Sequence, residues 1–155
     1  MTQDDAPPRR LPAAPAAADL DRLARIHGAC FPDAPWDAAH LARLLAMPGA
    51  IALADTAGFI MLRGAADEAE VITIAVDPAS RRRGAGRRLL AAALDAAART
   101  GADRIFLEVA VDNPPAIALY RAFAFDEVAR RRRYYRRRDG ESVDALVFSK
   151  RLFNE

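Results

Sequence analysis

Two side chains in the second half of the chain, Glu108 and Tyr120, have the chemistry to accept and to donate protons. Glu108 is the one acid in the apolar stretch 104–111, and Tyr120 follows twelve positions later. A carboxylate can take a proton from an attacking group, and a phenol can return one to a leaving group. Each residue also has a plainer explanation, because strand acids are often exposed at a sheet edge and helix tyrosines often pack in a core. Together the two residues point to acid–base chemistry.

A second candidate site is the segment 81–88, which is rich in arginine and glycine. Gly84 and Gly86 follow a predicted strand and open a predicted helix, whose first N–H groups have no helical partner and suit a diphosphate. Two known nucleotide-binding motifs do not fit this segment. A Walker loop needs a Lys-Ser or Lys-Thr pair after its glycines, and a dinucleotide-binding motif needs a third glycine where Leu89 stands. The alternatives are a loop for another phosphate ligand or a plain turn beside solvated arginines.

The elements that must position these residues follow from apolar periodicity and turn residues. Helical spacing predicts helices over residues 19–30, 36–47, 86–99 and 114–123. Alternating patterns predict strands over 50–54, 58–63, 70–76, 104–111, 127–135 and 142–150, with a short edge strand near 9–11. One strand–helix–strand crossover interrupts an antiparallel run. We expect an α/β (mixed α+β) fold with a mostly antiparallel sheet of six or seven strands and helices on both faces.

Length and composition bound the class of protein. The 155 residues are 52% hydrophobic and 28% charged, which predicts one globular domain over 19–155 after a flexible Pro/Ala-rich segment, 1–18. No apolar run approaches the roughly 20 residues that span a bilayer, and the acidic first residues do not form a secretory signal, so we expect a cytoplasmic protein. The single cysteine, Cys30, and the separated His27 and His40 predict no disulfide framework and no metal site.

The glycine segment resembles a known family. Arg-x-x-Gly-x-Gly at 81–86, after a strand ending Ile-Ala-Val-Asp-Pro at 74–78, is similar to the coenzyme A pyrophosphate loop of the GNAT acetyltransferases. The resemblance implies a GNAT-type sheet and acetyl-CoA as co-substrate. It implies that the backbone of Ile74, Ala75 and Val76 pairs with the pantetheine arm. The loop residues would hold the pyrophosphate: Arg81, Arg82, Arg83, Gly84, Ala85, Gly86 and Arg87.

The candidate acid–base pair extends this resemblance. Leu-Glu-Val at 107–109, then Asn113, then Ala-Ile-Ala-Leu-Tyr at 116–120 is similar to RimI-type GNAT enzymes, which acetylate the N-terminal alanine of a small-subunit ribosomal protein. The resemblance implies that Glu108 is the general base, Tyr120 the general acid and Asn113 a coenzyme A contact. It assigns three residues to acceptor binding: Trp36, Tyr134 and Tyr135. The likeness covers roughly residues 31–152, about four fifths of the chain.

Three departures from the family pattern concern mainly the acceptor side. Asp-Ala-Pro at 33–35 separates Phe31-Pro32 from Trp36, and Arg133 replaces the polar residue usual before the two tyrosines. Phe-Ala-Phe at 123–125 replaces Leu-Gly-Phe and removes a glycine helix cap. The acceptor is therefore less constrained by the sequence than the cofactor.

Arginines are concentrated in two runs. The five in 81–88 and the seven in 130–138 carry +12, so the rest of the chain sums to −10 for the net charge of +2. The second run, with its interleaved tyrosines, is either an RNA-binding stripe or an edge strand with solvated side chains. We favour the edge strand.

The sequence thus predicts an acetyl-CoA-dependent N-acetyltransferase that acts by direct transfer to a protein N-terminus, with alanine of a ribosomal protein as the leading acceptor. Within the enzyme class, the alternatives are a lysine side chain or a small amine. From another class, the alternative is a non-catalytic coenzyme A- or RNA-binding module. The expected partner is a protein N-terminus, without a membrane and with nucleic acid not favoured, and the expected state is a monomer or weak dimer.

Overall fold

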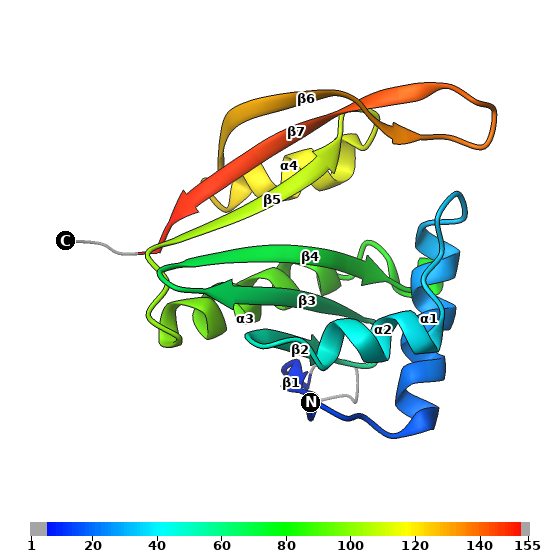
Figure 1. The fold of residues 1–155 in the computed structure, drawn as a ribbon, viewed down its shortest axis with the longest axis vertical. Helices are drawn as coiled ribbons and strands as arrows, with labels where there is room; N and C mark the ends of the chain where they lie inside the picture. Colours follow the sequence, from blue (N-terminus) through cyan, green and yellow to red (C-terminus); the bar gives the residue numbers. More distant parts are fainter. Residues whose placement is uncertain (1–5, 153–155) are drawn as a thin grey trace.

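The computed structural model describes residues 6–152, and one seven-stranded sheet of order β1-β2-β3-β4-β5-β7-β6 forms its centre (Figure 1). The strands are β1 (Arg9–Arg10), β2 (Ala50–Ala54), β3 (Gly58–Ala65), β4 (Glu68–Val76), β5 (Arg104–Ala110), β6 (Asp126–Arg136) and β7 (Ser142–Arg151). The helices are α1 (Ala17–Cys30), α2 (Ala38–Leu45), the 3₁₀ helix η2 (Pro78–Ser80), α3 (Ala85–Arg99) and α4 (Pro114–Ala122). Every neighbouring pair of strands is antiparallel except β4 and β5. The predicted mixed, mostly antiparallel sheet is confirmed.

Helices cover both faces of the sheet, as alternate residues of β3 show. Ile60 and Leu62 pack in a cluster with α3 and α4, while Phe59 and Met61 pack in a second cluster with α1 and α2. All four side chains are almost fully buried. Because both of its faces are covered, the first part of β3 is a continuous apolar run.

Part of the N-terminal segment is ordered, including the short edge strand predicted near residues 9–11. β1 pairs with β2, Leu11 is buried, and α1 begins at Ala17. The expected flexible segment therefore does not extend to residue 18, because a short strand pairing and an alanine-rich helix start order its second half. The same expectation for residues 1–5 lies outside the described residues.

The end of α4 accommodates the missing family glycine. Ala124 adopts a left-handed conformation with φ 62°, which glycine adopts without steric cost. The helix thus ends where the glycine cap would end it, and Phe125 turns into the core at 3% exposure. The substitution changes the local strain and not the path of the chain.

The parallel pair β4–β5 is joined at one end only. Its register contains three pairs, Glu68–Arg104, Ala69–Ile105 and Glu70–Phe106. Beyond these, β4 stays with β3 as far as Val76 and β5 stays with β7 as far as Ala110, and the two strands diverge (Figure 1). The sheet therefore opens between β4 and β5 towards their carboxyl ends. Within residues 6–152, no helix combines the length and the apolar character needed to cross a bilayer.

Candidate active site

Glu108 lies on β5, on the face opposite three buried residues, Ile105, Leu107 and Val109. β5 pairs with β7 along its whole length, whereas its register with β4 ends at Phe106, so Glu108 lies beside the opening between β4 and β5 and not at an outer edge of the sheet. The carboxylate is 20% exposed, and Oε1 lies 2.7 Å from Nε of Arg131 on β6. A half-buried carboxylate with an arginine partner is a charged group held in a defined place.

Tyr120, on α4, is 4% exposed and packs in the core cluster. Its ring centroid lies 5.8 Å from that of Phe125 and 6.2 Å from that of Phe148. Burial, and then the neighbouring Tyr135, raise the pKa of Tyr120 well above its ordinary value. The phenol therefore keeps its proton across the neutral pH range, so that core packing and a proton-donating role are compatible.

An irregularity in β6 brings Tyr134 and Tyr135 together. The register with β7 shifts between Arg131 and Tyr135, Arg133 has φ 50°, and its N–H donates to Asp144 at 2.9 Å. Neighbouring residues of a regular strand point to opposite faces. Here the two tyrosine ring centroids are only 5.1 Å apart. The position of Arg133 is one where a short polar residue is favoured, because such residues tolerate the left-handed region better.

The two tyrosines also interact with Glu108. The hydrogen bond to the Glu108 carboxylate is the largest cause that raises the pKa of Tyr134. Burial, and then the negative charge of Glu108, raise the pKa of Tyr135 to about 12. The electrostatic interaction with Tyr135 also contributes to the raised pKa of Tyr120. The elements β5, β6 and α4 therefore bring four of the predicted site residues into one cluster. The sequence analysis missed its fifth member, Arg131, whose guanidinium also lies 5.4 Å from the Tyr134 ring centre.

The glycine segment forms an open helix N-terminus. Gly84 is the N-cap of α3 with φ 77°, and Arg82 also has a positive φ of 65°. The first helical hydrogen bond runs from the N–H of Arg88 to the carbonyl of Gly84, so the N–H groups at 85–87 precede it. Four exposed arginines are next to these groups in the chain: Arg81, Arg82, Arg83 and Arg87. Free N–H groups and positive charge in this arrangement fit a diphosphate.

The backbone of β4 alternates between its two neighbours. Ala75 is paired with Phe59 on β3, and the N–H of Asp77 donates to Ala57 on the same side. By alternation, the backbone groups of Ile74 and Val76 face the open side towards β5. We therefore restrict the expected pantetheine contacts to these two residues. The Val76 carbonyl already accepts from the Cys30 thiol, at 3.1 Å.

Asn113 and Trp36 lie outside the cluster around Glu108. Asn113 caps α4, where its side-chain oxygen accepts from the N–H of Ala116 at 3.4 Å, and its contact with coenzyme A stays a prediction. Trp36 precedes α2, and its main-chain N–H donates to Nδ1 of His27 at 3.0 Å. The His27 and Trp36 rings stack at 4.4 Å. His27 is buried, and its burial, followed by the charge of His40, lowers its pKa to about 4. The sequence analysis did not predict this contact between His27 and Trp36.

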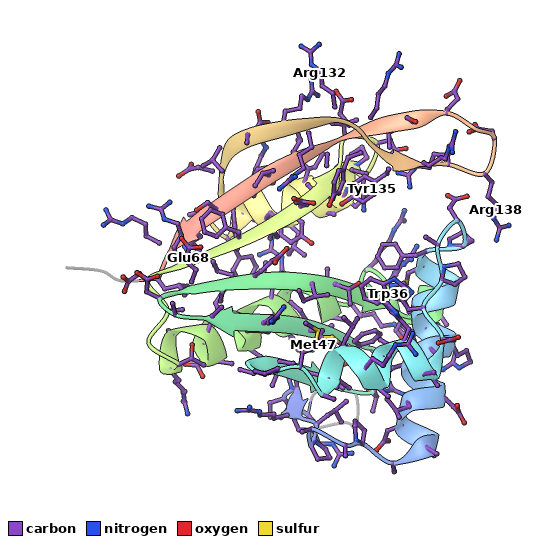
Figure 2. All side chains as sticks on the ribbon, viewed as in Figure 1. Trp36, Met47, Glu68, Arg132, Tyr135 and Arg138 are labelled. Atoms are coloured by element: carbon purple, nitrogen blue, oxygen red, sulfur yellow. The ribbon has the colours of Figure 1, made fainter. Side chains whose placement is uncertain are left out.

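Ion pairs connect the loop at 31–36 to the end of the β6–β7 hairpin. Asp33 lies 3.6 Å from Nε of Arg138 and 4.0 Å from Nη1 of Arg137, and Arg138 also donates to the Pro32 carbonyl. Arg137 in turn pairs with Asp112 at 2.5 Å. Figure 2 shows Arg138 directed from the hairpin towards this loop. These residues, Asp33, Arg137, Arg138 and Asp112, form what we name the hairpin clasp.

The arginine run at 130–138 lies along β6 and just beyond its end. β6 is one of the two edge strands of the sheet, as favoured for the run at 130–138, and Arg132 points away from the sheet (Figure 2). Arg130 pairs with Asp144 at 3.6 Å, so part of the run is neutralised locally. Among residues 6–152, no group of three or more His, Cys, Asp or Glu side chains is arranged to hold a metal ion.

Comparison with known proteins gives a consistent picture. The model of the acetyltransferase (GNAT) family matches residues 20–125. The chain is 46% identical over 129 residues to the N-alpha-acetyltransferase RimI of Mycobacterium tuberculosis, which covers 77% of this chain and 80% of that protein. It is 40% identical over 93 residues to the ribosomal protein bS18-alanine N-acetyltransferase of Escherichia coli, which covers 60% of this chain and 62% of that protein.

Solved structures agree with the sequence comparison. The crystal structure of the ribosomal-protein-S18-alanine N-acetyltransferase from Escherichia coli superposes with a TM-score of 0.77 at 28% identity, and covers 96% of each chain.

Another sequence relative, an uncharacterized protein of Mycobacterium leprae, is 45% identical over 128 residues, which cover 76% of this chain. The chain spans only 35% of the length of that relative.

Proposed function

This chain belongs to the acetyltransferase (GNAT) family and is RimI-like, and on that premise we propose that it acetylates the N-terminal amine of a protein, with alanine of a small-subunit ribosomal protein as the leading acceptor. The observation that carries the proposal is the cluster of Glu108, Tyr120, Tyr134 and Tyr135. The named activities of the two acetyltransferase relatives support this acceptor.

The features on the cofactor side fit acetyl-CoA. The free N–H groups at the start of α3 and the four adjacent arginines would hold the pyrophosphate, and the backbone of Ile74 and Val76 would hold the pantetheine arm. The bound co-substrate supplies an acetyl group activated as a thioester. The opening between β4 and β5 leads from the glycine segment towards Glu108.

The residues of this chain then have distinct roles. Glu108 accepts the proton that the acceptor nitrogen loses as its bond to the acetyl carbon forms. The Tyr120 hydroxyl donates to the sulfur as the carbon–sulfur bond breaks. Tyr134 and Tyr135 hold the acceptor backbone beside the carboxylate. The raised pKa of Tyr120 keeps the donor protonated until sulfur charge develops.

The base suits an α-amine better than a lysine side chain. An α-amino group has an ordinary pKa of about 7.7–8.0, and a lysine ammonium about 10.4. At neutral pH a sizeable fraction of the α-amine is therefore already neutral, and one carboxylate suffices to complete the deprotonation. The pairing of Glu108 with Arg131 also reduces the negative field that would hold the acceptor as an ammonium ion.

The test is acetylation of a peptide that begins with alanine and contains one internal lysine, compared with the same peptide carrying a blocked N-terminus. We expect thiol release and a mass increase at the α-amine, with the blocked peptide slower by at least about tenfold in kcat/KM. The Glu108→Gln variant is the control for enzyme-dependent transfer. Equal rates on the two peptides would contradict the preference for the N-terminus, and no transfer to either would contradict the proposed function.

A further inference from the structure

A buried ionic contact links the β2–β3 turn to the first turn of α3. The Asp55 side chain is 3% exposed, and its Oδ2 lies 3.8 Å from Nε of Arg88. Both atoms are buried, and neither has a hydrogen-bond partner within the described part of the chain. A buried carboxylate requires a compensating charge, and Arg88 supplies it. Arg88 has no place in the function proposed above.

Asp55 is a rigid anchor. Its Oδ1 accepts from the N–H groups of Ala57 at 2.9 Å and Gly58 at 3.1 Å, and its main-chain carbonyl accepts from Arg22 of α1 at 2.7 Å. Gly58 is itself confined, because a Cβ there would lie 2.2 Å from the Ala75 carbonyl oxygen. The position of the Asp55 carboxylate is therefore set by α1, β3 and β4.

From this anchor, Arg88 reaches the glycine segment. Its Nη1 donates to the carbonyl oxygen of Arg83 at 2.8 Å. In a trans peptide the carbonyl and the following N–H point in opposite directions. A carbonyl bound to Arg88 thus turns the Gly84 N–H away from Arg88, and keeps a negative dipole end away from the anion side of the loop.

The backbone conformation of this loop needs contacts from outside the loop to maintain it. Arg82 and Gly84 both have positive φ, and Arg82 carries a side chain that makes this region unfavourable. Backbone in such conformations persists where surrounding contacts impose it. The hydrogen bond from the Arg88 side chain to the Arg83 carbonyl supplies such a contact.

We propose that Arg88 is a positioning residue, anchored on Asp55, that orients the peptide between Arg83 and Gly84 for binding of the coenzyme A pyrophosphate. The inference rests on the proposed function only in taking this loop as the pyrophosphate site. Arg88 touches no diphosphate itself, since its guanidinium is directed to Arg83 and Asp55. Arg87, exposed on the same turn, is the candidate for direct contact.

The test compares two probes on the purified chain without acceptor: coenzyme A, which carries the pyrophosphate, and pantetheine, which lacks it. For Arg88→Lys, which keeps the charge beside Asp55 but cannot hold both partners, we expect the Kd of coenzyme A to rise by about tenfold or more, with the Kd of pantetheine within about twofold. Arg99→Lys, at the exposed far end of α3, is the matched control and should change neither.

The double variant Asp55→Asn/Arg88→Met removes both charges, so no unpaired buried ion opposes folding. It should weaken coenzyme A binding as much as Arg88→Met alone, because Asp55 acts through Arg88. Equal loss for both probes, or no loss for coenzyme A, would overturn the proposal. Since no acceptor is present, these results are independent of whether the alanine peptide is acetylated.

Discussion

At the residue scale, the cluster around Glu108 combines a carboxylate with three phenols and one guanidinium. The tyrosine pKa values are raised, Tyr135 to about 12, so the phenols stay neutral over the working pH range. The pH dependence of the rate should therefore be set by the acceptor amine and not by the loss of a tyrosine proton. Glu108 and Tyr120 can then be separated by the proton that each moves.

Replacing Glu108 by Gln keeps the shape of the side chain and removes the proton acceptor. We expect kcat/KM at neutral pH to fall by about 10²–10⁴-fold, and the deficit to shrink as pH rises through the α-amine pKa, because neutral amine then needs no base. A pH–rate profile measures this. Glu127→Gln, an exposed carboxylate of β6 paired with Arg121, is the control and should follow the parent. A deficit that is constant with pH would argue against the base role.

Replacing Tyr120 by Phe keeps the ring that packs against Phe125 and Phe148 and removes the donor. We expect kcat to fall by roughly 10²-fold, with no recovery at high pH, because alkaline solution supplies no proton to the sulfur. The Kd of acetyl-CoA should stay near that of the parent. If cofactor affinity falls instead, while kcat at saturation is retained, Tyr120 serves packing alone.

At the element scale, the strands and the long helices were predicted to within about two residues, because apolar periodicity and turn residues mark them directly. β2 matches the predicted range, and β1 confirms the short edge strand predicted near residues 9–11, although its pairing with β2 is not visible in the local pattern. The functional contacts that were missed are distant in sequence. The N–H of Arg138, for example, donates to Asp33 across 105 positions.

Separation in the sequence also explains which residues of the candidate site could be predicted and which could not. Glu108 and Tyr120 were found because their types and spacing match a chemistry. Arg131 and Arg88 were not, because in the sequence each is one arginine within a run. Only the folded positions of β5 and of the β2–β3 turn distinguish these two from their neighbours.

The hairpin clasp leads to a prediction for Asp33→Asn. Loss of the charge removes the ion pairs with Arg137 and Arg138 and weakens the attachment of the loop at 31–36 to the hairpin, although Arg138 still donates to the Pro32 carbonyl. We expect the acceptor KM to rise several-fold with the Kd of acetyl-CoA unchanged, and the acceptor KM to become less sensitive to salt than in the parent, since exposed pairs are screened. Steady-state kinetics at two ionic strengths measures this. Asp95→Asn, which removes an exposed ion pair with Arg99 on the solvent side of α3, should leave both constants unchanged; the same shift there would show a general charge effect.

At the scale of the whole molecule, His27 couples folding stability to pH. Its folded pKa is about 4, against 6.5 as the ordinary value, and its Nδ1 accepts from Trp36 and so must be unprotonated. Between these two values the unfolded chain binds the proton that the folded chain refuses, so stability falls as pH is lowered from 6.5 towards 4.

From pH 7 to 5.5, above the range where most carboxylates titrate, this single group should lower the free energy of unfolding by about 1 kcal/mol. Urea unfolding at the two pH values measures the change. In His27→Gln the difference between the two pH values should largely disappear, whatever the variant's absolute stability. A parent protein with equal stability at both pH values would contradict the assignment of a neutral, buried His27.

The three-residue seam between β4 and β5 also determines where amide protons exchange with solvent. Beyond Glu70 and Phe106, the backbone N–H groups of β4 and β5 that face the opposite strand have no β-sheet acceptor among the described residues. These groups nevertheless lie near the middle of the sheet. Deuterium uptake should therefore divide the sheet into two protected blocks, β1 to β4 and β5 to β7, with a fast-exchanging border between them. A pantetheine chain lying along that border would slow exchange on both of its sides at once, and would report occupancy of the seam without an assay of transfer.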